Sequence, residues 1–217
     1  METILSVKNL SKSFGDTKVL NRIDFEVKEG DFISIMGHSG SGKSTLLYSV
    51  SGMDKPSSGD VFLCGEEISK LDDEKMSAIR LSQMGFIFQH SYLLKNLSIK
   101  DNIVLPGFKL DKVSRDAVNA HADALMIKTG IDHIGMHDIK KVSGGQLQRA
   151  AICRALINKP VILFGDEPTG ALNSSTSKEV LDIINQINQE GTTIIIVTHD
   201  VKVAARSDEI IYLMDGR

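Results

Sequence analysis

The sequence predicts an α/β fold in which a core of buried strands carries an antiparallel β part and an inserted helical lobe. Short apolar runs at 32–36 and 161–165 are typical of buried strands. Alternating, strand-like segments precede the first run. Between 90 and 159 helical patterns dominate. We therefore expect a single domain, with its core in 1–89 and 160–217 and the helical lobe in 90–159.

The composition is that of a globular domain. With 217 residues, 41% of them hydrophobic, the chain can bury a sizeable core. A formal net charge of −3 gives no overall attraction to nucleic acid or to an anionic membrane, so we expect no nucleic-acid partner. No run approaches the roughly 20 apolar residues of a spanning helix, and the first three residues lack the basic start of a signal peptide. We expect a soluble, cytoplasmic chain that meets a membrane only through a partner.

Cysteines and histidines do not have the spacing of a metal site. Cys64 and Cys153 are too few for a disulfide scaffold or a zinc site, and we interpret them as reduced thiols. His121, His133 and His137 lack the one-turn spacing of a metal-binding pair, which favours surface or hydrogen-bonded histidines.

The first elements predict an antiparallel sheet. Segments 4–7 and 23–27 alternate in strand fashion around a turn-rich stretch at 11–16, which contains Phe14. A lone Phe is more often a core residue than a purine-stacking one, although a position beside a nucleotide would favour stacking. After a turn, residues 60–63 return the chain to this sheet.

Helices then alternate with buried strands. An acidic helix start at 72–74 leads to a buried strand at 84–88, which Gln89 follows. In the lobe, Ser114 can cap a helix that Gly130 stops. The apolar stripe of this helix indicates lobe core rather than a partner groove. A glycine-containing loop, 142–149, precedes a helix at 150–157.

Acidic residues and a histidine follow the last buried strands. Asp166 and Glu167 stand at the end of the 161–165 strand, where α/β folds place ligands. A helix at about 175–189 leads to a strand at 193–198, which His199 follows. A final strand at 209–214 ends in an Asp-Gly turn signal. Because a return strand would begin there, we expect a trimmed C-terminus or a short family member.

The glycine-rich stretch after the 32–36 strand is a Walker A loop. Its glycines allow the positive φ angles through which consecutive N–H groups converge on a phosphate at a helix N-terminus. Lys43 would reach the β- and γ-phosphates, and the hydroxyl of Ser44 would bind Mg²⁺. The alternative is a glycine-rich loop that only reverses the chain. Such a loop would not need the preceding strand, the complete Walker A spacing, Lys43 and Ser44. The predicted phosphate-binding residues are Gly37, His38, Ser39, Gly40, Ser41, Gly42, Lys43, Ser44 and Thr45.

Five features in fixed order resemble the ATP-binding subunit of an ABC transporter. They are the Walker A loop, Gln89, the Ser-Gly-Gly-Gln signature at 143–146, the Asp166-Glu167 pair and His199. The signature excludes small GTPases, kinases and RecA-type motors. The resemblance covers essentially the whole chain and implies a P-loop NTPase core of RecA-like type, with ATP and Mg²⁺ bound.

The resemblance also implies a role for each residue. Glu167 is the general base, and His199 contacts this base and the γ-phosphate, with Lys43 neutralising charge. Ser44, Asp166 and Gln89 hold Mg²⁺, and Gln89 also contacts the attacking water. Phe14 matches the adenine-stacking position. His38 occupies a variable loop position, where we expect no catalytic role.

In this family two subunits pair head to tail, so that each ATP lies between one Walker A loop and the signature of the other copy. We therefore expect a homodimer in the ATP-bound state. The signature residues that would close the partner's site are Ser143, Gly144, Gly145 and Gln146. The resemblance also implies an integral-membrane permease as partner, docked on the Gln89 loop and the helical lobe. This places the chain on the inner face of a bacterial cell membrane.

One position departs from the family pattern. The family usually has Asp after Ala-Leu in the loop beyond Glu167, whereas this chain has Asn173, which keeps hydrogen bonding and loses a charge. The sequence at 165–172 is similar to that of a group of lipoprotein-releasing, macrolide-export and bacitracin-type resistance ATPases. The Gly-Ala-Leu-Asn stretch looks most like the bacitracin and lantibiotic resistance branch.

Two functions stay open at this point. The first is an ATPase that powers export of, or resistance to, antimicrobial peptides or lipid-linked substrates. The alternative is a regulatory ATPase of the cell-division type that signals through a membrane protein. DNA-repair and translation ATPases of the family would need a coiled-coil insertion or two cassettes, and the sequence has neither.

Overall fold

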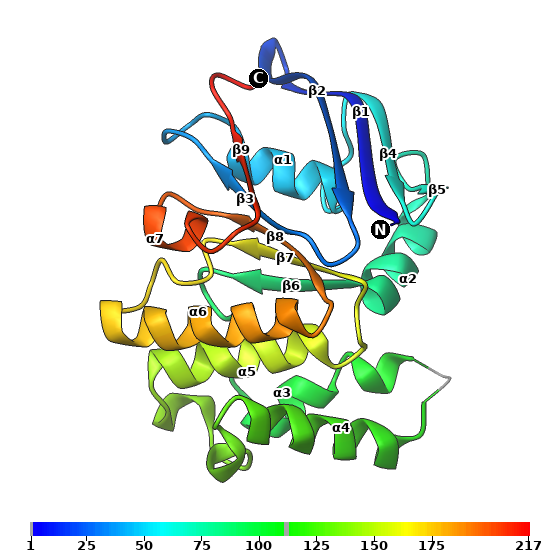
Figure 1. Cartoon of the computed structure of the whole chain (residues 1–217). Coiled ribbons are helices and arrows are strands. Elements are labelled where there is room, and N and C mark those ends of the chain that lie inside the picture. The colour runs from blue at the N-terminus through cyan, green and yellow to red at the C-terminus, as the bar shows by residue number, and fades with distance from the viewer. Residues whose placement is uncertain (1, 111–112) are drawn as a thin grey trace.

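A computed structural model describes residues 2–110 and 113–217. Two sheets and a helical lobe form its layers (Figure 1). The antiparallel sheet lies at the top of the view, the parallel sheet crosses the middle, and the lobe lies below. This arrangement confirms the predicted α/β fold.

The antiparallel sheet has the strand order β2-β1-β4-β5. Its strands are β1 (Thr3–Phe14), β2 (Thr17–Lys28), β4 (Ser58–Leu63) and β5 (Glu66–Glu67). The return of β4 to β1 confirms the expected topology. The expected turn at 11–16 was wrong, because Ser11 to Phe14 belong to β1. Their polar groups find partners in β2 and in the segment after the glycine-rich loop's helix: Ser11 Oγ accepts from Arg22 N at 2.9 Å, and Lys12 Nζ donates to Asp54 Oδ1 at 2.6 Å.

The parallel sheet has the order β6-β7-β8-β3-β9. Its strands are β3 (Phe32–Met36), β6 (Met84–Phe88), β7 (Ile162–Asp166), β8 (Thr193–Val197) and β9 (Glu209–Tyr212). Each pair in this sheet is parallel, so the segments that follow the strands emerge at one edge. That edge gathers the glycine-rich loop, Gln89, Glu167 and His199. β9 ends two residues earlier than expected, although Leu213 N still donates to Met36 O at 2.8 Å.

The predicted helices occur in the predicted order, together with two short helices, at 99–104 and 201–204, that the sequence did not predict. The helices are α1 (Lys43–Val50), α2 (Asp73–Gln83), α3 (Ile99–Val104), α4 (Arg115–Lys128), α5 (Gly144–Leu156), α6 (Ser174–Gln189) and α7 (Val201–Ala204). Three 3-10 turns accompany them: η1 (Gly107–Lys109), η2 (Asp132–Ile134) and η3 (Ile139–Lys141). The expectation that a loop continues to residue 149 was wrong, because α5 already begins at Gly144. A capping box between Ser143 and Gln146 starts the helix despite its two glycines.

The inner strands β3, β7 and β8 of the parallel sheet are buried on both faces, whereas the edge strand β9 is largely exposed. Leu163 and Ile194 belong to a cluster shared with the lobe helices and α6, whereas Phe164 and Ile195 belong to a second cluster shared with α1, α2 and the antiparallel sheet. Alternate residues of one strand therefore pack into the two clusters on opposite faces of the sheet. This explains why these strands are continuous apolar runs in the sequence.

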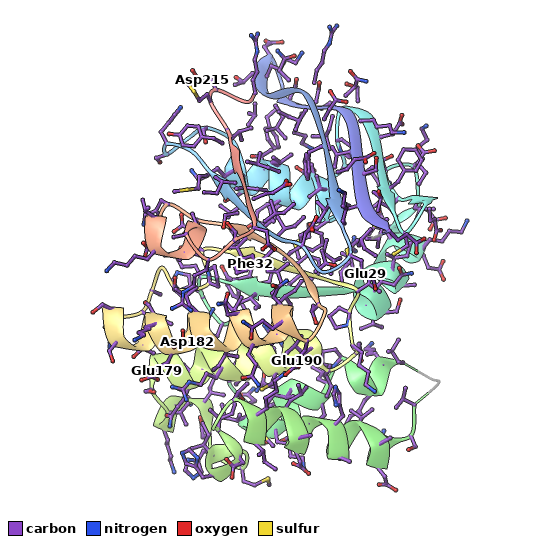
Figure 2. The ribbon with its side chains drawn as sticks, in the orientation of Figure 1. Glu29, Phe32, Glu179, Asp182, Glu190 and Asp215 are labelled. Atoms are coloured by element: carbon purple, nitrogen blue, oxygen red, sulfur yellow. The ribbon has the colours of Figure 1, made fainter. Side chains whose placement is uncertain are left out.

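Helix α6 is tied to its surroundings by three ion pairs. Figure 2 labels its acids Glu179 and Asp182 and the acid Glu190 that caps its C-terminus. They pair with Arg149 of α5, with Arg206 just beyond α7, and with Lys128 of α4, respectively. The helix after Glu167 is thus fixed to both the lobe and the core. No helix in the described part of the chain has the length and apolarity to cross a membrane.

Candidate active site

The glycine-rich loop forms an open helix N-terminus. Gly37, Gly40 and Gly42 have φ angles of 150°, 81° and 101°, which only glycine adopts readily. Gly42 is the N-cap of α1, and no side chain in the described part of the protein caps this helix. The first N–H groups of α1 are therefore free of a capping side chain and suit an anion.

The Lys43 side chain folds over its own loop. Its ammonium donates to the carbonyl oxygens of Gly37 at 2.9 Å and His38 at 2.8 Å. This leaves one N–H of the three for an incoming phosphate. The side chain of His38 is committed elsewhere, because its ring nitrogens lie 2.8 Å from Ser39 O and 3.1 Å from Asp215 Oδ1 (Figure 2 labels Asp215).

A cavity of about 400 Å³ joins this loop to two residues predicted from later strand ends. Glu167 and His199 line it together with Val19, a residue of β2 that the sequence reading missed. The loop residues in its wall are Ser39, Gly40, Gly42, Lys43, Ser44 and Thr45. Gly37, His38 and Ser41 are not among the lining residues. A phosphate in this cavity would meet an ammonium, helix N–H groups, a carboxylate and an imidazole.

Glu167 and His199 are in direct contact. Nδ1 of His199 lies 2.9 Å from Oε1 of Glu167. Glu167 has a φ of 47°, in the left-handed region that a non-glycine residue adopts at a cost. Its N–H donates to Val197 O at 2.9 Å, which fixes this backbone against β8. The Glu167 side chain thus lies in the wall of the cavity that the loop also lines.

Asp166 accepts two hydrogen bonds from α1. Ser44 Oγ donates to its Oδ1 at 3.0 Å, and Tyr48 Oη donates to its Oδ2 at 2.5 Å. Burial, followed by the hydrogen bond to Asp166 and the charge of Asp166, holds the pKa of the Tyr48 phenol well above its usual value. The sequence reading missed Tyr48. Its position one turn after Ser44 was the available signal.

Gln89 lies at the end of β6, where the register places Phe88 opposite Asp166. A Cβ built on Gly170 would lie 3.1 Å from both Gln89 Nε2 and Glu167 Oε2, so the two side chains border the same glycine. Within the described residues, Gln89 makes no hydrogen bond to Ser44 or Asp166. Its predicted role as a metal ligand therefore stays a prediction.

The signature residues lie outside this cavity. Ser143 is exposed, and its side chain accepts from Gln146 N at 3.3 Å, while Gln146 Oε1 accepts from Ser143 N at 2.9 Å. Gly144 and Gly145 form the first turn of α5. A Cβ on Gly145 would lie 2.2 Å from Thr176 Cγ2, so the helix start packs closely on α6.

Gln148 was also missed. It is 1% exposed, and its Nε2 donates to Phe88 O at 2.9 Å and to Pro168 O at 2.7 Å. Its Oε1 accepts from Ser91 Oγ at 3.0 Å. One side chain thus joins the signature helix to both sides of Gln89 and to the residue after Glu167.

Phe14 and Asn173 sit at the margins of the site. Phe14 is 54% exposed at the end of β1, and Lys12 Nζ lies 4.9 Å from its ring centroid. It does not line the cavity of the loop, and adenine stacking stays a prediction. Asn173 is the N-cap of α6, where its Oδ1 accepts from Thr176 N at 3.0 Å. Asn and Asp cap equally well, so the family departure keeps the cap.

The residues present fit Mg²⁺. The Ser44 hydroxyl and the Asp166 carboxylate lie side by side, and both are the oxygen donors that a hard cation prefers. Beside the loop that would hold the phosphates, such a pair can complete the shell of a nucleotide-bound ion.

Comparison with known proteins also supports a nucleotide-binding site. A family model described as ABC transporter matches residues 20–170. The lipoprotein-releasing system ATP-binding protein LolD of Aquifex aeolicus (strain VF5) is 39% identical over 217 residues, covering 100% of this chain and 96% of its own length. The macrolide export ATP-binding/permease protein MacB of Bdellovibrio bacteriovorus is 40% identical over 98% of this chain, which spans 33% of MacB.

A solved structure gives the same fold. It is described as a dimeric, post-hydrolysis state of the ATP-binding cassette MJ0796 bound to ADP and Pi, and it matches with a TM-score of 0.88 at 37% identity, covering 98% of this chain and 95% of the other. This likeness confirms the expected nucleotide-binding core.

Proposed function

The chain belongs to the ABC transporter family and is an ATP hydrolase, and we propose that it powers a separate membrane permease. The observation that carries the proposal is the cavity in which the glycine-rich loop, Glu167 and His199 meet. We assign the phosphates of ATP to this cavity and the adenine to Phe14.

The geometry suits phosphoryl transfer to water. The transition state spreads charge over the γ-oxygens, so catalysis is mainly positioning and charge neutralisation. Lys43 and the first N–H groups of α1 supply positive charge at the phosphates. Glu167 accepts the proton of the water that attacks the γ-phosphorus, and the bond to the β–γ bridging oxygen breaks to release ADP. His199 orients the Glu167 carboxylate through the 2.9 Å contact.

Ser44 and Asp166 would hold Mg²⁺, with Gln89 as a third contributor. The ion supplies further neutralisation at the β- and γ-phosphate oxygens when bound.

The working unit of this mechanism is a head-to-tail dimer. The signature residues lie outside the cavity of their own chain, and Ser143 is exposed. A second copy would bring its Ser143 and the N-terminus of its α5 to the γ-phosphate, where the helix dipole favours negative charge. The dimeric state of the solved MJ0796 structure supports this arrangement.

The permease is proposed to dock in a groove of about 250 Å³ between the core and the lobe. Its wall is mainly apolar, with Met53, Phe86 and Phe88 among its residues. Arg80 and Arg154 also line it, and neither forms an ion pair with a described carboxylate. These two cations fit a permease segment with apolar residues and an acidic one. Such docking would place the chain on the cytoplasmic face of the membrane.

The transported substrate is proposed from the relatives. LolD is described as part of a lipoprotein-releasing system and MacB as a macrolide exporter. These names support a lipid-linked or antibiotic substrate. The proposal of antimicrobial peptides rests on the Gly-Ala-Leu-Asn stretch at 170–173 alone.

Phosphate release by the purified chain tests the catalytic assignment. We expect E167Q to bind ATP with Mg²⁺ and to hydrolyse it about 10² to 10⁴ times more slowly, because a general base typically contributes that much. E66Q makes the same charge change at an exposed residue outside the cavity and should hydrolyse like the wild type. E167Q should sediment as a dimer at saturating ATP and Mg²⁺. Normal turnover by E167Q would contradict the role of Glu167 as general base, and a monomer under these conditions would contradict the proposed dimer.

Reconstitution with a candidate permease in proteoliposomes tests the coupling. M53E places a negative charge in the groove at a residue that is 40% exposed, and M136E does so on the lobe at one that is 80% exposed. We expect M53E to keep basal hydrolysis and lose stimulation by the permease, while M136E keeps both. Equal stimulation of the two variants would exclude this groove as the docking site.

A further inference from the structure

We infer that Tyr48 is a positioning residue that holds the Asp166 carboxylate in the orientation needed to bind the Mg²⁺ of the nucleotide. The inference rests on the proposed function, because it takes Asp166 as a metal ligand. It assigns a purpose to a side chain outside every motif of the site.

The geometry divides the two oxygens of Asp166 between two donors. Tyr48 Oη lies 2.5 Å from Oδ2, and Ser44 Oγ lies 3.0 Å from Oδ1. Because each oxygen has its own donor, the carboxylate cannot rotate about its terminal bond without losing both hydrogen bonds. Oδ1 is thereby kept beside the hydroxyl of Ser44, which is also a predicted metal ligand.

One helix delivers both donors. Ser44 and Tyr48 are four residues apart on α1, so they lie on the same face of the helix. The N-terminus of α1 is also the predicted phosphate site. The phosphates, the hydroxyl ligand and the clamp on the carboxylate ligand are therefore set by one rigid element, which makes their mutual distances insensitive to movements of the lobe.

Packing accounts for the position of the Tyr48 ring, but it assigns no role to the Tyr48 hydroxyl. The ring is partly buried against the cluster that α1 shares with the antiparallel sheet. The Tyr48 carbonyl accepts from Met53 N at 3.0 Å and Asp54 N at 3.1 Å, and these backbone bonds would survive a change to Phe. Among the described residues, the hydroxyl forms a hydrogen bond to Asp166 and to no other group, so Y48F isolates that bond.

The test measures how much the metal improves nucleotide binding. Calorimetric titration with a non-hydrolysable ATP analogue gives one Kd with Mg²⁺ and one with EDTA, and the ratio of the two is the metal-dependent gain. Hydrogen-bond partners of metal ligands typically contribute 10- to 100-fold to metal affinity. We expect Y48F to lower this ratio about tenfold with an unchanged Kd in EDTA. A merely structural role would weaken both Kd values alike.

Two further variants separate the possible failures. D166N should lower the ratio at least as much as Y48F, and Y212F, at an exposed tyrosine of β9, should leave it unchanged. A wild-type ratio for Y48F with a reduced ratio for D166N would overturn the positioning role and leave the metal site intact. A wild-type ratio for D166N would overturn the metal assignment and the inference with it. If Y48F did not fold, Y48M would remove the hydroxyl and take its place.

Discussion

Nδ1 of His199 lies 2.9 Å from Oε1 of Glu167, although the two residues follow different strands of the parallel sheet. The contact joins the ends of β7 and β8 on the wall of the phosphate cavity. Glu167 also has a left-handed backbone with a φ of 47°, so its turn and its contact with His199 together fix where the carboxylate lies.

The contact predicts the effect of removing the imidazole. H199A should lower kcat by about 10²-fold or more, since a misoriented base loses most of the contribution of proton transfer. Its Kd for the ATP analogue should stay within a few-fold of the wild type, because Lys43 and the loop remain. Phosphate release and calorimetry check both values. H133A, at an exposed histidine of the lobe, is the matched control. Wild-type turnover by H199A would remove His199 from the mechanism.

The buried hydrogen bonds of Gln148 predict that replacing this residue lowers the stability of the fold. Q148L leaves the carbonyls of Phe88 and Pro168 without a donor at a residue that is 1% exposed. An unsatisfied buried group costs about 1–3 kcal/mol, so we expect the free energy of unfolding to fall by about 2–4 kcal/mol. Urea unfolding followed by circular dichroism measures it.

Gln189 provides the control for that change. It is exposed at the end of α6, so Q189L should change the unfolding free energy by no more than about 0.5 kcal/mol. If the two variants were equally stable, the three hydrogen bonds of Gln148 would not contribute to the fold.

Much of this architecture is visible in the sequence, and the reason is local. The strands β3, β6, β7 and β8 are buried on both faces, so they appear as continuous apolar runs whatever their neighbours are. The glycine-rich loop needs specific residue types at fixed spacing, which makes it recognisable without the fold. The start of α5 was predicted six residues too late, because the two glycines after Ser143 indicate a loop, whereas the capping box of Ser143 and Gln146 begins the helix at Gly144.

Contacts between segments far apart in the sequence could not be predicted from local sequence patterns. Tyr48 and Asp166 are separated by 118 positions, and Gln148 and Phe88 by 60. Each pair depends on how helices and strands pack, which periodicity within one segment does not encode. The expected turn at 11–16 failed for a related reason. Its polar residues are typical of a turn, and only the partners from β2 and from the segment after α1 let them lie in a strand.

The two cysteines predict different reactivity. Cys153 is buried, and burial raises the pKa of its thiol to about 11, so the thiolate fraction at pH 8 is about 10⁻³. Cys64 is exposed. A disulfide reagent at pH 8 should titrate one thiol quickly in the folded chain and the second only after unfolding. C64S should abolish the fast phase and C153A should leave it. Two fast thiols in the wild type would contradict the burial of Cys153.

His121 on α4 predicts an acid-sensitive lobe. Burial, and secondarily the charge of Lys159, lowers the pKa of its imidazole below 6.5, and its Nε2 is buried without a partner within the described residues. The folded state therefore keeps the neutral ring while the unfolded chain binds a proton near pH 6.5. Stability that is complete above pH 6.5 should then decline as the pH falls below it, because the unfolded state binds more protons. Urea midpoints measured between pH 5 and pH 8 should fall more steeply for the wild type than for H121L, with the exposed H133L as control. Parallel pH profiles for the wild type and H121L would show that another group makes the protein sensitive to acid.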